Sequence, residues 1–146
     1  MSIVKYLDPR LVVFFDAKTR DAAIKILVDQ IAEAGKIHDK KAFYNATIDR
    51  EKIVSTGIGM GVAVPHAKLP AYEDFFIAIG ILKEGVDWNA LDGAPVRFIF
   101  LIGGPDDKQT EYLQILSKLT LAIKDETMRK KMLAAQTPEV VVSLFR

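Results

Sequence analysis

The chain has 146 residues, of which 50% are hydrophobic and 27% are charged, a composition typical of a soluble globular protein. Its 20 Lys and Arg residues nearly balance its 19 Asp and Glu residues, so no net field favours nucleic acid or an anionic membrane surface. The absence of cysteine excludes disulfides and thiolate zinc sites, and we expect a cytoplasmic protein.

No segment is predicted to enter a membrane. The longest apolar run, residues 75–82, is eight residues long and too short to span a bilayer. Residues 1–8 lack the long apolar region of a signal peptide. The sequence contains no repeat, low-complexity segment or linker, so we expect residues 1–146 to form a single domain.

The first elements of the chain follow clear local signals. Residues 2–7 predict a short helix, and the apolar run 11–15 predicts a strand. Thr19 is a good cap for a helix that Gly35 ends. The apolar residues between these two positions have helical spacing: Ile24, Leu27, Val28, Ile31 and Ala34.

A second helix is predicted from Asp39, its cap, to about Lys52. Arg50 falls in the last turn of this helix, where the helix dipole favours a cation. The spacing alone therefore leaves Arg50 as either a helix-end partner or a functional cation.

A glycine-rich stretch follows and leads to a histidine. Gly57, Gly59 and Gly61 alternate with larger residues, which permits close approach of another backbone or of a ligand. Residues 62–64 predict a short buried strand that Pro65 ends, because proline has no N–H to donate. His66 then lies at the strand end, and imidazole is the nucleophile best suited to neutral pH.

Two apolar runs, residues 75–82 and 96–102, predict strands that are buried on both faces. Their connection is too short for a crossover helix, so we expect this pair to be antiparallel. The other strands and helices alternate along the chain. We therefore predict an α/β fold: a single three-layer domain whose mixed, mostly parallel sheet of about five strands has helices on both faces.

Three helices are predicted after the second of these strands. Asp106 or Asp107 is the expected cap of the first, and Asp125 begins the next. Thr137 followed by proline opens the last helix. The inward face predicted for the first of the three helices consists of Leu113, Leu116, Leu119 or Thr120, and Ile123.

The stretch from Thr56 to His66, with Arg50 and Glu51 upstream, resembles the signature of the IIA phosphocarrier domain of the phosphoenolpyruvate-dependent sugar phosphotransferase system, in its fructose/mannitol/nitrogen-type branch. The resemblance continues through residues 88–96 and 109–116. It implies that His66 accepts a phosphoryl group on Nε2 from a histidine phosphocarrier protein. It also implies that Arg50, sixteen residues before His66, lies beside that group.

The sequence departs from the family pattern at Tyr112, because the family usually has a second histidine there. The tyrosine is predicted either to pack beside Leu116 or to point its hydroxyl toward His66 and the phosphoryl group, directly or through one water. Further support for the phosphoryl site is expected from Ser55, Thr56 and Lys68, with the backbone of the glycine stretch around it.

Other chemistries fit less well. His38 lies in a polar loop, and two histidines that far apart without a ligand-spaced carboxylate motif make a poor metal site. The alternating glycines lack the spacing of a P-loop or a dinucleotide fingerprint, and no serine has a histidine placed for a triad. We expect no metal and no cofactor.

The expected function is that of a phosphotransferase relay component with a phosphohistidine intermediate. Its donor is a histidine phosphocarrier protein, and its recipient is a separate IIB component or a regulatory target protein of the nitrogen-type branch. A weak partner contact is expected, with Met60 or Leu69 as its apolar anchor. The alternative is a non-catalytic regulatory interaction module that keeps the fold but has lost efficient transfer, for which Tyr112 is the only support.

Overall fold

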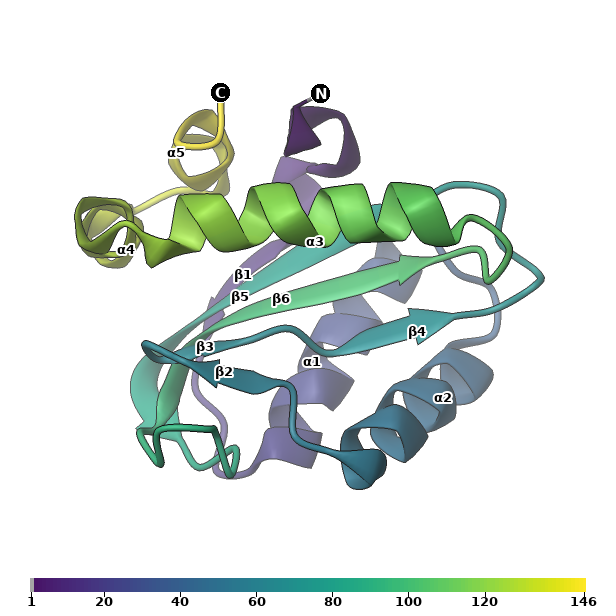
Figure 1. Cartoon of the computed structure of the whole chain (residues 1–146), viewed down its shortest axis with the longest axis horizontal. Helices are drawn as coiled ribbons and strands as arrows, with labels where there is room; N and C mark the ends of the chain where they lie inside the picture. Colours follow the sequence, from purple (N-terminus) through teal and green to yellow (C-terminus); the bar gives the residue numbers. More distant parts are fainter. Residues whose placement is uncertain (1) are drawn as a thin grey trace.

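The computed structural model describes residues 2–146 and contains one six-stranded sheet (Figure 1). The strands are β1 (Val12–Phe15), β2 (Gly57–Gly59), β3 (Val62–Ala63), β4 (His66–Lys68), β5 (Phe76–Val86) and β6 (Val96–Gly104). The helices are α1 (Arg20–Glu33), α2 (Lys40–Ile53), α3 (Gln109–Lys124), α4 (Glu126–Ala134) and α5 (Pro138–Ser143), with short 3-10 helices η1 (Ile3–Tyr6) and η2 (Pro9–Leu11).

The sheet is mixed, as predicted. Its main path runs β1-β5-β6-β3-β2, and β4 pairs with β6 beside that path. The β1–β5, β3–β6 and β4–β6 pairs are parallel, whereas β5–β6 and β2–β3 are antiparallel. The antiparallel pairing expected between the two apolar runs is confirmed in β5 and β6.

Helices cover both faces of the sheet, which gives the predicted three layers (Figure 1). Phe98, Phe100 and Ile102 of β6 pack on the side of α3 and α5. The alternate residues Ile99 and Leu101 pack on the side of α1 and α2. Because residues 98–102 are buried on both faces, this part of β6 contains no polar residue and forms a continuous apolar run.

The predicted start of α3 is wrong, and its predicted inward face is confirmed at Leu119 and Ile123 but wrong at Leu113. Asp106 and Asp107 lie in an exposed bend, and the helix begins after Lys108, which forms no side-chain cap. The buried face consists of Tyr112, Ile115, Leu119 and Ile123, whereas Leu113 is 52% exposed. The helix is rotated so that the aromatic ring of Tyr112, which has the larger apolar area to bury, packs against Phe75.

The chain continues as a strand beyond Pro65. The proline has no N–H, and β3 ends just before Val64. The Pro65 carbonyl still accepts from the backbone N–H of Ile102 at 3.0 Å, and pairing with β6 resumes at His66. His66 therefore begins the edge strand β4, where the sequence had predicted a strand end.

The glycine stretch forms the β2–β3 turn. Gly59, Met60 and Gly61 have positive φ angles of 98°, 62° and 74°. The Asp92 carboxylate accepts the Met60 N–H at 3.1 Å, which fixes the turn against the loop between β5 and β6. Of the two predicted reasons for glycine here, the structure shows close approach of another backbone.

Gly57 gives a direct test of that packing. A Cβ added to Gly57 would lie 2.7 Å from Ala90 Cβ and 2.9 Å from Ala90 Cα, so Gly57→Ala forces backbone to move. We expect this substitution to lower the free energy of unfolding by about 1–3 kcal/mol in urea titrations. Gly35→Ala is the comparison that has backbone strain without crowding, because Gly35 has a φ of +77° and open space around it. A Gly57→Ala protein as stable as wild type would contradict the close packing.

None of the helices described between residues 2 and 146 is both long enough and apolar enough to cross a membrane.

Candidate functional site

His66 begins the edge strand β4, which pairs with β6 on the side away from β5. Its side chain lies on the α3 side of the sheet. Its neighbour Ala67 is buried on the α1–α2 side, and side chains alternate along a strand, so His66 and Lys68 share the other face. The Nδ1 atom of His66 lies 3.3 Å from the carbonyl oxygen of Val64. Since a carbonyl only accepts, Nδ1 carries the proton and Nε2 keeps its lone pair.

The surroundings of His66 keep its imidazole neutral. Burial lowers the pKa below its usual value of 6.5, and the positive charges of Arg50 and Lys68 lower it further. The Val64 carbonyl opposes this shift by stabilising the Nδ1 proton. A neutral imidazole with a free Nε2 is the nucleophilic form.

The lowered pKa predicts a defined pH dependence. The unfolded chain binds a proton at His66 more readily than the folded chain does. The contribution of His66 to the free energy of unfolding is therefore fully present above pH 6.5 and is lost as pH falls from 6.5 through the folded pKa. We expect an NMR titration of the His66 ring protons to give a midpoint below 6.5. A midpoint above that value would contradict the burial and charges around the ring.

Arg50 has the position expected of a helix-end cation and acts electrostatically on the site. Its Nη1 donates to the carbonyl oxygen of Val54, the C-terminal cap residue of α2, at 3.0 Å. This is its only hydrogen bond to residues 2–146, so its other N–H groups are open to a ligand. Its positive charge contributes to the lowered pKa of His66 and partly offsets the rise that burial causes in the pKa of Tyr112.

Tyr112 packs against His66 from the first turn of α3. The two ring centroids are 5.4 Å apart with a 49° tilt. Within residues 2–146 the tyrosine hydroxyl forms no hydrogen bond, so the direct bond to His66 that the sequence suggested is absent. Burial raises the pKa of the Tyr112 phenol, which keeps its proton available for donation.

Lys68 closes the site on the α3 side. Its Nζ donates to Oε1 of Gln109 at 2.8 Å and lies 4.2 Å from the centroid of the Tyr112 ring. Lys68 lies on the same face of the sheet as His66, because β4 is extended. A second cation therefore lies beside His66, held by the start of α3.

The hydroxyls of Ser55 and Thr56 have protein partners. Ser55 Oγ donates to the carbonyl of Trp88 at 2.6 Å, and Thr56 Oγ1 donates to Oε1 of Glu51 at 2.5 Å. Thr56 is buried, and its backbone N–H also donates to Glu51, at 2.6 Å. These residues therefore hold the loop before the glycine stretch, and the sequence alone did not single out Glu51 for that task.

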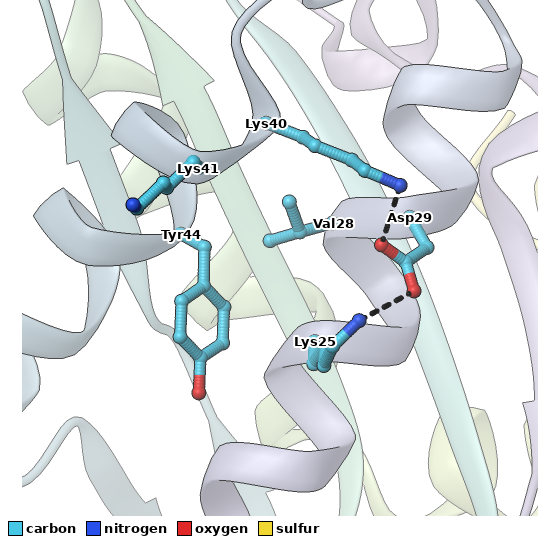
Figure 2. A pocket seen from close by; sticks show the side chains of 6 residues that line it. All are labelled: Lys25, Val28, Asp29, Lys40, Lys41 and Tyr44. Atoms are coloured by element: carbon cyan, nitrogen blue, oxygen red, sulfur yellow. Dashed lines mark hydrogen bonds and ion pairs between the residues drawn. The ribbon is translucent and has the colours of Figure 1, made fainter.

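The hollow between α1 and α2 is separate from this site. It has a volume of about 200 Å³, and its lining includes Val28, Lys41 and Tyr44 but not His66 or Arg50 (Figure 2). Asp29, which also lines this hollow, forms ion pairs with both Lys25 and Lys40 (Figure 2). His38 is exposed and adjoins Tyr72, with ring centroids 6.2 Å apart.

Solved structures that are similar to this one share its fold. The nitrogen regulatory protein IIA-Ntr of Neisseria meningitidis superposes with a TM-score of 0.91 over 99% of each chain, at 24% identity. The mannitol IIA of Escherichia coli superposes with a TM-score of 0.80 over 96% of this chain and 99% of its own, at 23% identity. The fold is therefore that of the IIA domains.

The family follows from the sequence match. Residues 5–146 match the profile of the family described as "Phosphoenolpyruvate-dependent sugar phosphotransferase system, EIIA 2", and the chain belongs to this family. The family resemblance predicted from Thr56 to His66 is confirmed, and EIIA domains are phosphotransfer components of that system.

Relatives of two kinds are similar to this chain. The fructose-specific EIIA component of Haloferax volcanii is 35% identical over 123 residues, covering 84% of this chain and 80% of the relative. The nitrogen regulatory protein of Escherichia coli is 32% identical over 131 residues, covering 88% and 78%. The chain spans only 20% of the fructose-specific EIIABC component of Bacillus subtilis, to which it is 34% identical over 130 residues.

Proposed function

We propose that this chain carries a phosphoryl group on Nε2 of His66. The observation that supports this most is the contact of Nδ1 with the Val64 carbonyl, which leaves Nε2 unprotonated and open. As a P–N bond to Nε2 forms, the P–N bond in the donor breaks. Arg50 and Lys68 offset the negative charge of the transferred group, and such positioned cations supply most of the catalysis of phosphoryl transfer.

The proposed donor is a histidine phosphocarrier protein, and the proposed location is the cytoplasm. One solved relative, the mannitol IIA of Escherichia coli, is in complex with a phosphorylated IIB. By analogy the onward acceptor is a IIB component, and because this sequence contains no cysteine, a IIB cysteine would lie outside residues 1–146. The nitrogen regulatory relatives support the other outcome, in which a target protein reads the phosphorylation state.

The partner surface is proposed beside Arg50 and Tyr112, the two candidate site residues next to His66. Ile53 and Val54, which follow Arg50, are 79% and 57% exposed, and Leu113, next to Tyr112, is 52% exposed. Three exposed apolar side chains around a polar centre suit a small, transient contact. Of the two anchors expected from the sequence, Leu69 packs on the α2-side core, whereas Met60 is 37% exposed at the β2–β3 turn near Arg129 and stays a prediction.

The substitution Tyr112→Phe tests the proposed donation by the tyrosine hydroxyl. We expect the variant to slow formation of the phosphohistidine, or shorten its lifetime, by about 3- to 10-fold, the worth of one modest hydrogen bond. Tyr112→His should be tolerated. Tyr44→Phe is the matched control, because Tyr44 lines the hollow between α1 and α2 (Figure 2). Equal rates and lifetimes for Tyr112→Phe and wild type would show that the tyrosine only packs.

The proposed function is tested by incubating the protein with phosphoenolpyruvate, the first enzyme of the system and a histidine phosphocarrier protein. We expect an acid-labile, alkali-stable phosphoryl adduct, which a IIB protein added afterwards removes if the chain is a transport component. An adduct that persists with IIB proteins supports the regulatory branch. The absence of any adduct would instead support the non-catalytic interaction module.

A further inference from the structure

Glu51 is the one carboxylate of residues 2–146 that is fully buried, at 2% exposure. It lies in the last turn of α2, next to Arg50, and no cation of the described chain forms an ion pair with it. Burying a carboxylate costs several kcal/mol unless hydrogen bonds satisfy its oxygens. Both oxygens of Glu51 therefore need hydrogen-bond donors.

Both oxygens of Glu51 bind the same residue. The backbone N–H of Thr56 donates to Oε2 at 2.6 Å, and its hydroxyl donates to Oε1 at 2.5 Å. Bonds of this length to an ionised carboxylate are charge-assisted and strong. Two bonds from one residue to one rigid carboxylate fix the backbone of Thr56, including the direction of its carbonyl.

The Thr56 carbonyl leads in two steps to the nucleophile. It accepts the backbone N–H of Val64 at 3.0 Å, and the Val64 carbonyl in turn faces Nδ1 of His66 at 3.3 Å. Val64 precedes proline and is therefore restricted to an extended backbone, so little freedom is left in its carbonyl. Glu51 therefore acts on His66 by fixing the positions of the backbone groups between them.

From this connection we propose that Glu51 is a positioning residue for His66: by fixing Thr56, and through it Val64, it holds the Nδ1–H tautomer that leaves Nε2 free. The proposal rests on the proposed function only for its effect on transfer. Without a fixed acceptor at Nδ1, imidazole populates both tautomers, and the fraction with a nucleophilic Nε2 falls.

The positioning is geometric and does not need the charge of Glu51. A glutamine of the same shape accepts the Thr56 N–H with its oxygen and donates its amide to the hydroxyl oxygen, which rotates to accept. Glu51→Gln should therefore keep His66 in place, whereas Glu51→Ala should release it. Thr47→Val is the matched control, because Thr47 is buried on the same helix and its hydroxyl donates only to the Phe43 carbonyl at 2.9 Å.

The experiment measures the His66 tautomer by ¹⁵N NMR in the unphosphorylated full chain, together with kcat and KM for the phosphocarrier donor. For Glu51→Ala we expect a lower Nδ1–H fraction and a loss in kcat of about 10-fold, typical of removing a supporting partner, with KM unchanged. Glu51→Gln and Thr47→Val should keep the wild-type tautomer and stay within about 3-fold of its kcat. A folded Glu51→Ala protein with the wild-type tautomer would overturn the proposal, as would Glu51→Gln losing the tautomer.

A second variant covers the case in which Glu51→Ala fails to fold. Thr56→Val preserves shape and removes only the hydroxyl bond to Glu51, so it should shift the tautomer in the same direction by a smaller amount. An unchanged tautomer in that variant overturns the proposal. Because the tautomer is read without any phosphoryl group, it decides the role of Glu51 even if wild type accepts no phosphoryl group, a result that would count against the proposed function alone.

Discussion

The variant His66→Ala is expected to take up no phosphoryl group while keeping its fold. His66 is half-buried at the start of an edge strand, and its ring bonds only the Val64 carbonyl, so its removal leaves the two cores intact. No other side chain near it offers a nucleophile at neutral pH. The measurement is the phosphorylated fraction at completion, by intact-protein mass, with circular dichroism to check the fold.

His38→Ala is the control for this prediction. It removes the other histidine, which is exposed in the loop between α1 and α2, and should leave uptake unchanged. Full uptake by His66→Ala together with loss of uptake by His38→Ala would overturn the site assignment.

Arg50→Lys is expected to slow transfer strongly without abolishing it. Lysine keeps the positive charge but loses the planar fork, which holds the Val54 carbonyl with one nitrogen and leaves the rest for phosphoryl oxygens. One lost charge-assisted donor at a developing anion is worth about 2–4 kcal/mol, which corresponds to a rate loss of about 30- to 1,000-fold. Single-turnover transfer from the phosphorylated donor gives this rate directly.

Arg97→Lys is the matched control for Arg50→Lys. Arg97 also donates to backbone carbonyls, those of Leu82 and Lys83, but it lies in β6 far from the end that pairs with His66. The control should lose stability only. If Arg50→Lys transfers at the wild-type rate, Arg50 serves only as a helix-end cation that donates to the Val54 carbonyl.

Much of the fold was predictable because local signals and burial agree. The caps at Thr19, Asp39, Asp125 and Thr137 each accept a backbone N–H as predicted. The two long apolar strands form the predicted antiparallel centre. The start of α3 was not predictable, because two aspartates before a helix satisfy the capping rule equally well and neither is used.

The rotation of α3 depended on a tertiary contact. Helical spacing favoured Leu113 as an inward residue, but the ring of Tyr112 packs beside His66 and Phe75 instead. An aromatic residue next to a leucine offers two nearly equal faces, and only the shape of the facing sheet selects between them.

The candidate site was predictable where chemistry marks a residue, as at His66 and Arg50. The groups that orient them were not, because the Val64 acceptor is a backbone carbonyl and has no signature in the sequence. The other orienting group, Glu51, is a side chain that the sequence does show. Its burial, however, follows from the turn between α2 and β2, which places Thr56 against its carboxylate. Its neighbours in sequence do not distinguish it from an exposed helix-end glutamate.

The central claim is that His66 carries the phosphoryl group on Nε2 because Nδ1 is held by Val64. The most direct measurement is ¹H–¹⁵N NMR of the phosphorylated, ¹⁵N-labelled protein, which identifies both the histidine and the nitrogen that bears phosphorus. We predict phosphorus on Nε2 of His66, with Nδ1 still protonated toward the Val64 carbonyl. A phosphoryl group on Nδ1 of His66, or on His38, would contradict the account.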